Sequence, residues 1–435
     1  MPAFKTVRGM RDFLPEEMIL RQQVLEKIKS IFEICGFQPL ETPAIESLDL
    51  LSAKGASGEE VLKETYNFED LGGRRVGLRY DLTVPLARVI ASNPNIPLPF
   101  KRYQVQNVWR YGDIAKDRFR EFLQADIDIV GIESMLADAE IVACTLSCFS
   151  SLGFKKFVIR LNNRKILSAL VKYAGVETEK IMDAFRAIDK LEKVGEKGVE
   201  GELQERGISK GAVKKILDFV NIKGDSETML KKAEELVKGF EEGREGIEEL
   251  KQLILCLKQM KVEPSFKIDL SLARGLDYYT GPIFEVFAAE GIGSLAGGGR
   301  YDKLIGLFLG RDIPATGISL GIERIIEVMK ERKMIKPQKT KTKIFVVAVN
   351  EEAREKVLEI TQNLRKNGMS ADFDLKGRNL TRQLEYADSL DIPYAVIVGP
   401  KELKEEKVVL RDMKKREQRV VEIKNLCEEI LGSLR

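Results

Sequence analysis

The chain has 435 residues, of which 44% are apolar and 32% charged, and its formal net charge is only +3. This length is enough for about three domains with hydrophobic cores. Apolar runs stay well below the roughly 18 residues of a membrane-spanning helix, and the first residues lack the apolar stretch of a secretory signal, so we expect a cytoplasmic protein. The near-neutral charge excludes a general attraction to nucleic acid, and any RNA contact has to depend on local basic patches.

The chain contains no histidine, and its five cysteines are scattered. The lack of histidine excludes a Ser-His-Asp triad, a His-paired cysteine nucleophile and His-ligated zinc. Residues 317–321 match the nucleophile-elbow pattern of hydrolases, but the histidine base that this elbow needs is missing. The cysteine spacing indicates neither a disulfide framework nor a zinc site, so we expect reduced thiols. Arginines remain as candidates for chemistry that stabilises charge on oxygen atoms.

The first predicted element in chain order is a helix over residues 14–36. Its apolar residues recur at helical spacing, and Pro15 and Gly36 mark its two ends. Shorter elements follow, namely strands at 37–43 and 75–82, a helix at 84–91 and a loop at 93–99. Two long strand-like segments come next, at 101–111 and 118–131. The polar residues between them indicate an antiparallel hairpin with a charged tip that can reach a ligand.

Residues 166–262 have a different character, because charged amphipathic helices replace the strand pattern there. We interpret this segment as an inserted helical module. Strand character resumes after it, at 266–272 and 283–289, and residues 318–329 change from a strand to an apolar-faced helix. A basic, poorly patterned stretch then begins at 331 and is typical of an exposed linker between domains.

The last part of the chain alternates strand and helix patterns. The predicted elements are strand 343–349, helix 351–367, strand 370–373, helix 380–389 and strand 394–398. This spacing is typical of a compact α/β module in which helices connect the strands. We therefore expect a second fold at the C-terminal end of the chain.

The most informative segments are 274–285, which reads RGLDYYTGPIFE, and 296–302, which reads AGGGRYD. They set an arginine, two tyrosines and three adjacent glycines beside predicted strands. Glycine weakens a regular element, so three in succession indicate a turn whose backbone approaches something closely. We expect a small-molecule pocket here that accepts phosphate or a planar ligand.

Over nearly its whole length the chain resembles the histidyl-tRNA synthetases, a branch of the class II aminoacyl-tRNA synthetases. The motifs that carry the resemblance are the opening 8–15, motif 1 at 36–43, motif 2 in the hairpin from Val108 with Phe119-Arg120-Glu121-Phe122, motif 3 at 317–324, and the two histidyl signatures at 274–285 and 296–302. The resemblance implies an α+β fold with an antiparallel-sheet catalytic domain at 1–330 that includes the insertion 166–262. A linker at 331–342 and an α/β anticodon-binding domain at 343–435 complete the implied organisation.

The resemblance also implies a set of histidine-binding residues: Asp81, Leu82, Thr83, Gln124, Asp128, Tyr278, Tyr279 and Tyr301. Asp81, Thr83 and Gln124 would hold the α-ammonium, for which a carboxylate and two neutral acceptors are suitable. Asp128, with the tyrosines, would recognise the imidazole, and strand alternation places it on the same face as Gln124. The alternative is that Asp126 and Asp128 lie on a solvated strand face.

The ATP-binding residues that the resemblance implies are Arg110, Arg118, Arg274, Gly321 and Arg324. Arg110 would grip the α-phosphate and Arg324 the γ-phosphate, because a guanidinium presents a fork of donors to oxyanions. Arg274 would neutralise charge at the α-phosphate during the reaction, so Arg110 and Arg274 are the candidate catalytic residues. A surface ion pair is the ordinary alternative for any single arginine.

The implied reaction activates L-histidine with ATP to histidyl-adenylate and transfers it to the 3' end of tRNA(His). ATP is then a substrate, and Mg²⁺ is expected on its phosphates, although the sequence does not identify metal ligands. Motif 1 implies a homodimer. Four basic residues of the C-terminal module are candidate tRNA phosphate contacts, or equally a solvated basic face: Lys376, Arg378, Arg382 and Lys401.

Two alternatives remain open. One is a synthetase-like, histidine-binding regulatory subunit of a histidine-biosynthesis enzyme, a class that typically lacks the C-terminal module and loses signature arginines. The other is a class II synthetase for threonine, proline or glycine, which would share Arg110 and Arg324 but not the signatures at 274–285 and 296–302.

Overall fold

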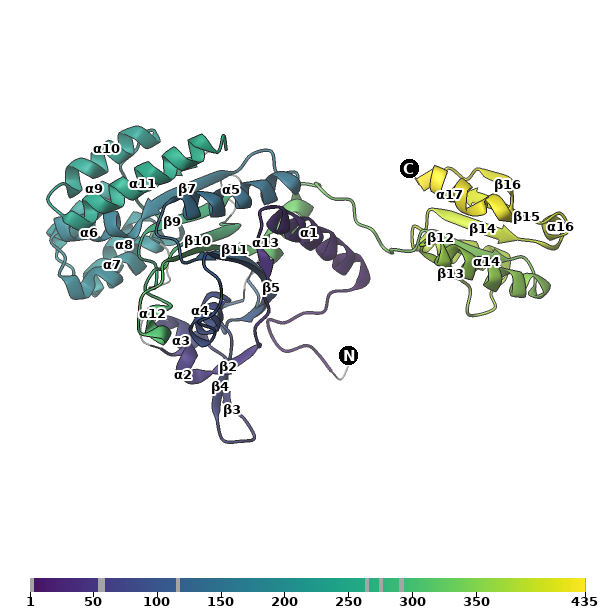
Figure 1. Ribbon diagram of the computed structural model, residues 1–435, viewed down its shortest axis with the longest axis horizontal. Helices are drawn as coiled ribbons and strands as arrows, with labels where there is room; N and C mark the ends of the chain where they lie inside the picture. Colours follow the sequence, from purple (N-terminus) through teal and green to yellow (C-terminus); the bar gives the residue numbers. More distant parts are fainter. Residues whose placement is uncertain are drawn as a thin grey trace. The chain divides into compact units, whose positions relative to one another are not determined.

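The computed structural model describes residues 4–53, 59–114, 118–262, 266–273, 277–288 and 293–434. The chain divides into two compact units, one formed by Met1–Arg11 and Val24–Met334 and the other by Asp12–Gln23 and Ile335–Arg435. Figure 1 shows the elements of both units along the chain. The exact domain bounds 1–330, 331–342 and 343–435 stay a prediction.

The first unit is built on a large sheet. Its strands are β1 (Gln38–Pro39), β5 (Phe100–Trp109), β6 (Glu121–Val130), β7 (Val158–Asn163), β8 (Phe266–Ile268), β9 (Pro282–Phe287), β10 (Ala296–Arg300) and β11 (Ala315–Gly321). Among the described residues their order is β1-β5-β6-β11-β10-β9-β7-β8. From β5 through β6, β11, β10 and β9 to β7, each strand runs antiparallel to its neighbours. Strands β1 and β8 lie at the two edges and are parallel to their neighbours. The predicted hairpin is confirmed as β5 and β6.

The three glycines of β10 lie in the middle of this sheet, so the predicted glycine-rich turn is wrong. A Cβ atom at Gly298 would collide with the carbonyl oxygen of Gly317 in β11, and one at Gly299 would lie 2.6 Å from the carbonyl oxygen of Pro282. The close approach that the glycines permit is therefore an approach of neighbouring strands. The sequence pattern indicated close packing correctly but assigned the wrong element to it.

The two faces of the sheet differ because side chains alternate along each strand. On one face, Ile127 of β6 and Ile318 of β11 are buried and opposite each other. Helices α5 (Leu136–Ser151) and α13 (Ile322–Glu331) pack on β6 and β11 and cover this apolar face. The other face of the same strands carries polar residues and glycines.

Smaller elements precede β5 in the chain. They are α1 (Pro15–Ile34), β2 (Ile45–Ser47), α2 (Leu48–Leu51), α3 (Glu59–Glu64), β3 (Asn67–Glu69), β4 (Arg75–Leu78) and α4 (Thr83–Ser92). The first of them, helix α1, spans the division between the two units at residues 23 and 24, and the others belong to the first unit. Strands β2, β4 and β3 form a separate antiparallel sheet. The helix predicted at 84–91 is confirmed as α4, whereas the predicted strands 37–43 and 75–82 are too long. Strand β4 ends at Leu78 because the chain turns there toward the start of α4.

The segment predicted as an insertion is helical, and its bounds 166–262 stay a prediction. Its elements are α6 (Arg164–Ala174), η1 (Thr178–Lys180), α7 (Ile181–Asp189), α8 (Leu191–Glu205), α9 (Lys210–Val220), α10 (Ser226–Val237) and α11 (Glu241–Gln259). Side-chain caps define several helix starts, such as Ser209 Oγ, which accepts from the Ala212 N–H at 3.3 Å. Helix α11 packs closely on α6. The glycine at position 243 permits this approach, since a Cβ atom there would lie only 2.8 Å from the Cβ of Ala169. In the chain, these helices come directly after strand β7, which the sequence patterns did not reveal.

The second unit contains a five-stranded sheet with the order β13-β12-β14-β15-β16 among the described residues. Its elements are β12 (Ile344–Ala348), η2 (Glu351–Ala353), α14 (Arg354–Lys366), β13 (Ala371–Phe373), α15 (Leu380–Ser389), β14 (Tyr394–Val398), α16 (Pro400–Leu403), β15 (Lys407–Asp412), β16 (Gln418–Glu422), η3 (Ile423–Asn425) and α17 (Leu426–Leu434). The five predicted elements are confirmed, and the last hairpin and α17 were not predicted. The α+β fold class is confirmed. No described helix of either unit is long and apolar enough to cross a membrane.

Candidate active site

The polar face of the large sheet forms the floor of a buried site. Gln124, Asp126 and Asp128 alternate along β6, and the cross-strand partners of Asp126 are Gln104 on β5 and Ser319 on β11. Asp126 and Asp128 are only 3% and 2% exposed. The solvated-face alternative for these two aspartates is therefore wrong.

Asp128 is held by two partners inside the protein. Its Oδ2 atom lies 2.8 Å from Nη2 of Arg102, and its Oδ1 atom accepts a hydrogen bond from the hydroxyl of Tyr301. Gly317 lies opposite Asp128, and a Cβ there would collide with Oδ1. Burial raises the pKa of Asp128, while the charge of Arg102 opposes this shift. Glycine at 317 thus makes the room in which this carboxylate sits.

Asp81 and Thr83 reach the same site from the start of α4. Asp81 Oδ1 accepts hydrogen bonds from the backbone N–H groups of Thr83 and Val84, at 3.1 and 3.0 Å, and so caps the helix. Burial raises the pKa of Asp81, and the nearby charges of Arg110 and Arg102 lower it. The Leu82 side chain is buried, and its carbonyl oxygen accepts from Arg102 Nη2 at 3.1 Å. The turn that ends β4 therefore serves both the helix and the site.

Three tyrosines form an aromatic wall beside the two aspartates. The ring centroids of Tyr278 and Tyr279 are 4.9 Å apart, and those of Tyr278 and Tyr301 are 5.9 Å apart, both with edge-to-face geometry. The Tyr278 hydroxyl lies 3.5 Å from Asp81 Oδ2. All three rings are buried, and burial raises the pKa of Tyr278 and of Tyr301 well above the ordinary value. The aromatic rings give the wall an apolar surface, and the hydroxyl groups of Tyr278 and Tyr301 contact the carboxylates of Asp81 and Asp128.

The buried acceptors of the site differ in their hydrogen-bond partners. Gln124 Oε1 accepts no hydrogen bond from the described residues, whereas the Ser319 hydroxyl is a hydrogen-bond neighbour of Asp126 and lowers its pKa. Burial raises the pKa of Asp126 to about 7, the charge of Arg102 lowers it, and the charges of Asp128 and Asp81 raise it further. Sequence reasoning did not assign a role to Asp126 or Arg102. The alternation of polar residues along β6 was the available signal for Asp126, whereas Arg102 is recognisable only from its register opposite Asp128.

The structure gives side-chain contacts for some of the arginines predicted to bind ATP but not for all of them. Arg110 follows β5, donates from Nε to the Tyr80 carbonyl at 3.1 Å, and has its guanidinium 4.2 Å from the centre of the Tyr80 ring. Arg324, in the first turn of α13, donates from Nη1 to the Ser294 carbonyl at 2.7 Å. Arg118 is exposed. Arg274 lies outside the described residues, so the convergence of these arginines stays a prediction.

Gly321 ends β11 opposite Gln124 and begins α13. A Cβ atom there would meet nothing closer than the Leu295 carbonyl oxygen, at 3.6 Å. A Cβ atom at position 321 would therefore be in ordinary van der Waals contact with this carbonyl oxygen. Glu323 follows in α13 and accepts from the Leu123 N–H at 3.1 Å, which fixes the helix to β6.

The helical insertion holds both flanks of segment 274–276. Before it, Arg164 of α6 donates to the Ala273 carbonyl at 2.7 Å. After it, Arg186 of α7 pairs with Asp277 at 2.8 Å. The insertion thus contacts residues that lie next to the predicted catalytic arginine and the tyrosine wall.

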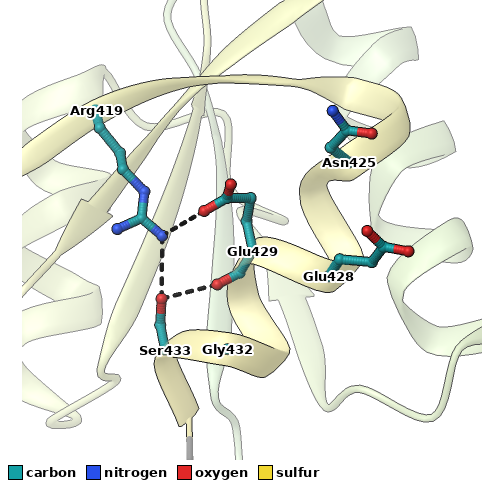
Figure 2. A pocket seen from close by; sticks show the side chains of 6 residues that line it. All are labelled: Arg419, Asn425, Glu428, Glu429, Gly432 and Ser433. Carbon is teal, nitrogen blue, oxygen red and sulfur yellow. Dashed lines mark hydrogen bonds and ion pairs between the residues drawn. The ribbon is translucent and has the colours of Figure 1, made fainter.

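A hollow of about 500 Å³ in the second unit is a separate feature, shown in Figure 2. It is lined by Arg419, Asn425, Glu428, Glu429, Gly432 and Ser433. Arg419 Nη2 pairs with Glu429 at 2.8 Å and lies 3.1 Å from the Ser433 hydroxyl. Arg419 is already paired and a second carboxylate, that of Glu428, also lines the hollow, so this hollow is unsuitable for a phosphate. It is not part of the site on the large sheet.

Comparisons with known proteins agree with this architecture. Residues 9–325 match the histidyl-tRNA synthetase family, and residues 343–432 match the anticodon binding domain family. The chain is 39% identical to the histidine–tRNA ligase of Thermococcus kodakarensis over 100% of both chains. It is 42% identical to that of Aeropyrum pernix, over 91% of this chain and 90% of the relative. A crystal structure of histidyl-tRNA synthetase from Nostoc sp. matches with a TM-score of 0.86 and 35% identity over 100% of both chains. The chain therefore belongs to the histidyl-tRNA synthetase family.

Proposed function

We propose that this protein ligates L-histidine to tRNA(His) in two steps, with ATP as the second substrate. In the first step the histidine carboxylate attacks the α-phosphorus of ATP, and pyrophosphate leaves. In the second step the 3'-terminal ribose hydroxyl of the tRNA attacks the carbonyl carbon of the adenylate, and AMP leaves. The observation that carries the proposal is the buried acidic floor with its tyrosine wall, in a chain of this family.

The floor suits an amino acid with a cationic end and an imidazole. Asp81, Thr83 and Gln124 receive the α-ammonium, because a carboxylate and neutral oxygens match its N–H donors. Asp128 and the tyrosine wall receive the imidazole ring. The charge of Arg102 opposes the rise that burial causes in the pKa of Asp128, and the Tyr301 hydroxyl fixes the orientation of this carboxyl group. A neutral apolar side chain would offer no hydrogen-bond donor to this buried polar end of the pocket, which supports selection for histidine.

The arginines supply the positive charge that ATP requires. Arg110 binds the α-phosphate, Arg324 the γ-phosphate, and Arg118 assists at the hairpin tip. Arg274 neutralises the charge that builds up at the α-phosphorus, so Arg274 and Arg110 are the catalytic residues. Support comes from Arg110, which lies close enough to Asp81 to lower its pKa.

The chemistry needs alignment and charge stabilisation more than a protein base. The attacking carboxylate is already ionised at neutral pH, and pyrophosphate leaves without a proton from the protein. Holding both reactants in line replaces a bimolecular encounter by a reaction within one complex. This agrees with a chain that has no histidine.

Mg²⁺ is expected on the ATP phosphates. The described residues contain no cluster of three or more Asp, Glu, Cys or His side chains that could hold a metal ion. This chain therefore does not present a metal cage in the described ranges, and no step of the reaction is assigned to the metal. When bound with ATP, Mg²⁺ would supply charge neutralisation on the phosphates.

The proposed partners besides histidine and ATP are tRNA(His) and a second copy of the chain through motif 1. The α/β module at 343–435 would bind the anticodon end of the tRNA. Among its candidate contacts, the Arg378 side chain is already 3.4 Å from Asp374, with its guanidinium 4.3 Å from the centre of the Tyr386 ring. Lys376, Arg382 and Lys401 are the remaining candidates.

The regulatory-subunit alternative has less support. Such proteins typically lack the C-terminal module, whereas residues 343–432 of this chain match an anticodon binding domain. Exchange of labelled pyrophosphate into ATP distinguishes the two functions, because a subunit that only binds histidine does not form an adenylate. Histidine-dependent exchange is the expected result, and its absence in a folded protein would favour the alternative.

A further inference from the structure

The side chain of Arg110 is held at one end of its guanidinium and unpaired at the other. Its Nε atom donates to the Tyr80 carbonyl at 3.1 Å, and the guanidinium lies 4.2 Å from the centre of the Tyr80 ring and 5.1 Å from that of Phe122. Neither terminal nitrogen of Arg110 donates a hydrogen bond to any described residue. The two donors that grip an oxyanion are therefore available.

The backbone on both sides of Arg110 is also fixed. The N–H of Trp109 donates to the Arg79 carbonyl at 3.1 Å, and the N–H of Tyr111 donates to the Glu64 carbonyl at 2.7 Å. Glu64 is the last residue of α3, a short helix that lies outside all the motifs of the sequence. A residue without a motif thus contacts the immediate neighbour of the arginine assigned to the α-phosphate.

Glu64 reaches Arg110 by a second route, through Tyr80. The Tyr80 hydroxyl donates to Glu64 Oε2 at 2.9 Å. Burial raises the pKa of Tyr80 to about 12, and the charge of Glu64 adds to this rise although that of Arg110 opposes it. The hydroxyl therefore keeps its proton at neutral pH and remains a donor. Glu64 holds both the ring beside the guanidinium and the residue that follows it.

We propose that Tyr80 and Glu64 are positioning residues that set the orientation of the Arg110 guanidinium for the α-phosphate of ATP. The proposal rests on the proposed function, because it concerns an arginine assigned there to ATP. A long side chain loses rotamer freedom when it binds a ligand, and contacts that hold it beforehand reduce this cost. The free terminal nitrogens then face the nucleotide as a ready fork of donors.

The ordinary alternative is that Tyr80 only packs in the fold. Two measurements distinguish this alternative from positioning. Asp81 follows Tyr80 directly, so the affinity for histidine without ATP reports whether this turn has moved. A positioning residue also acts through Arg110, so its replacement has no further effect once Arg110 is removed.

The test measures kcat/KM for ATP in histidine-dependent pyrophosphate exchange, and the dissociation constant of histidine by calorimetry. Tyr80→Leu removes the ring and should lower kcat/KM for ATP by about 10- to 100-fold, because the guanidinium is no longer held in line. Its affinity for histidine should change by less than about threefold. Tyr80→Phe keeps the ring and loses only the hydroxyl, so it should lose about three- to tenfold.

The decisive comparison places Tyr80→Leu in an Arg110→Ala background. There it should change kcat/KM for ATP by less than about twofold. If the two effects multiply instead, Tyr80 acts independently of Arg110 and the proposal is overturned. Near-normal values in Tyr80→Leu or in Arg110→Ala overturn it as well, and so does a loss of histidine affinity in Tyr80→Leu that equals the loss for ATP.

Glu64 is tested by a second cycle of mild variants, which decides the matter if thermal melting shows that Tyr80→Leu does not fold. Glu64→Ala removes the acceptor and should lose about as much as Tyr80→Phe. The double variant should be no slower than the slower single one, because both changes break one hydrogen bond. Glu64→Gln keeps an acceptor and should retain most of the rate. Effects that multiply in the double variant contradict the proposal.

Tyr173→Leu is the matched control. The Tyr173 ring on α6 lies 5.3 Å from Nζ of Lys215, so the same change breaks a similar contact elsewhere in the same unit. Both measured quantities should stay at the wild-type values, and a loss equal to that of Tyr80→Leu overturns the proposal. The wild type is scored first. No exchange by the wild type means that the proposed function fails, whereas exchange that Tyr80→Leu does not diminish means that only this inference fails.

Discussion

Two buried arginines on opposite faces of the same sheet show how one residue type serves structure and binding. Arg300 on β10 is 2% exposed, and each nitrogen of its guanidinium has an acceptor, from Asp138, Asp302 or the carbonyls of Ile132 and Ser134. Arg102 on β5 is 0% exposed, yet its Nε atom has no partner among the described residues.

The carboxylates around the two arginines differ in the same way. Asp138 is held directly by Arg300, and nearby Asp302 is partly exposed to water. Arg102 instead lies among three fully buried carboxylates, of which it pairs directly with one. All donors of the Arg300 guanidinium are paired, so this arginine stabilises the core. Around Arg102 the buried carboxylates outnumber the cation that pairs with them, and such a place favours binding of a cationic ligand.

The largest expected effect concerns Arg300. Replacing it, as in Arg300→Met, leaves Asp138 buried without its cation, so the free energy of unfolding should fall by about 3–5 kcal/mol. Denaturant unfolding measures this. The control is Arg74→Met, which breaks a pair whose arginine is 79% exposed and should cost less than about 1 kcal/mol. Equal losses of stability in both variants would show that the buried Arg300 does not stabilise the fold more than an exposed ion pair does.

Arg274 is predicted to act only on the substrate, which is the opposite of Arg300. Arg274→Ala should slow histidine-dependent pyrophosphate exchange by at least about 10²- to 10³-fold, because a charge opposite the reacting phosphate is lost. Its melting temperature should match that of the wild type. Arg274→Lys keeps the charge and should recover part of the rate. Near-normal exchange in Arg274→Ala would refute the catalytic assignment.

The pH dependence of stability tests the burial of Asp126. In the empty protein the pKa of Asp126 is raised to about 7, whereas in the unfolded chain it is about 3.9. The folded state therefore keeps a proton that the unfolded state releases, and the contribution of Asp126 to stability falls as pH rises from about 4 to about 7.

The variant Asp126→Asn lacks the titrating carboxyl group, so it lacks the loss of stability that this group causes as pH rises. Without ligand it should be more stable than the wild type at pH 8, by on the order of 2 kcal/mol, and the difference should vanish toward pH 4. Asp138→Asn should instead destabilise the protein, because Arg300 loses its direct partner. Unfolding curves at several pH values test both. A destabilised Asp126→Asn at pH 8 would mean that Asp126 is already paired in the fold.

The smallest expected effect concerns the insertion. Arg186 pairs with Asp277, which directly follows segment 274–276, but both side chains are partly exposed, so the pair is worth only about 1 kcal/mol. Arg186→Ala should lower kcat of pyrophosphate exchange by roughly fivefold. Lys231→Ala, which breaks an exposed pair within α10, should leave kcat unchanged. Equal rates in both variants would show that the insertion does not position this segment.

The sequence predicted those parts of the fold that local patterns determine. Helices α4 and α15 and the hairpin of β5 and β6 have clear periodicity, and their predicted bounds are close to the observed ones. Strand β7 was not recognised. The glycines of β10 were misread because glycine permits a turn and a close approach of strands alike, and only the neighbouring strands decide between the two.

The site was predictable to the extent that it follows motifs and alternation along one strand. Asp81, Asp128 and Tyr301 are indeed brought together, and alternation along β6 correctly placed Gln124 and Asp128 on one face. The importance of Arg102 and Asp126 depends on cross-strand register and on which acceptors remain unpaired. Those properties arise only when β5, β6 and β11 are assembled.

The most direct test of the central claim is amino-acid-dependent exchange of labelled pyrophosphate into ATP, measured with each of the twenty amino acids. The buried acidic floor and the tyrosine wall predict exchange with histidine and only background exchange with the others. Exchange driven by threonine, proline or glycine, or no exchange with any amino acid, would contradict the account.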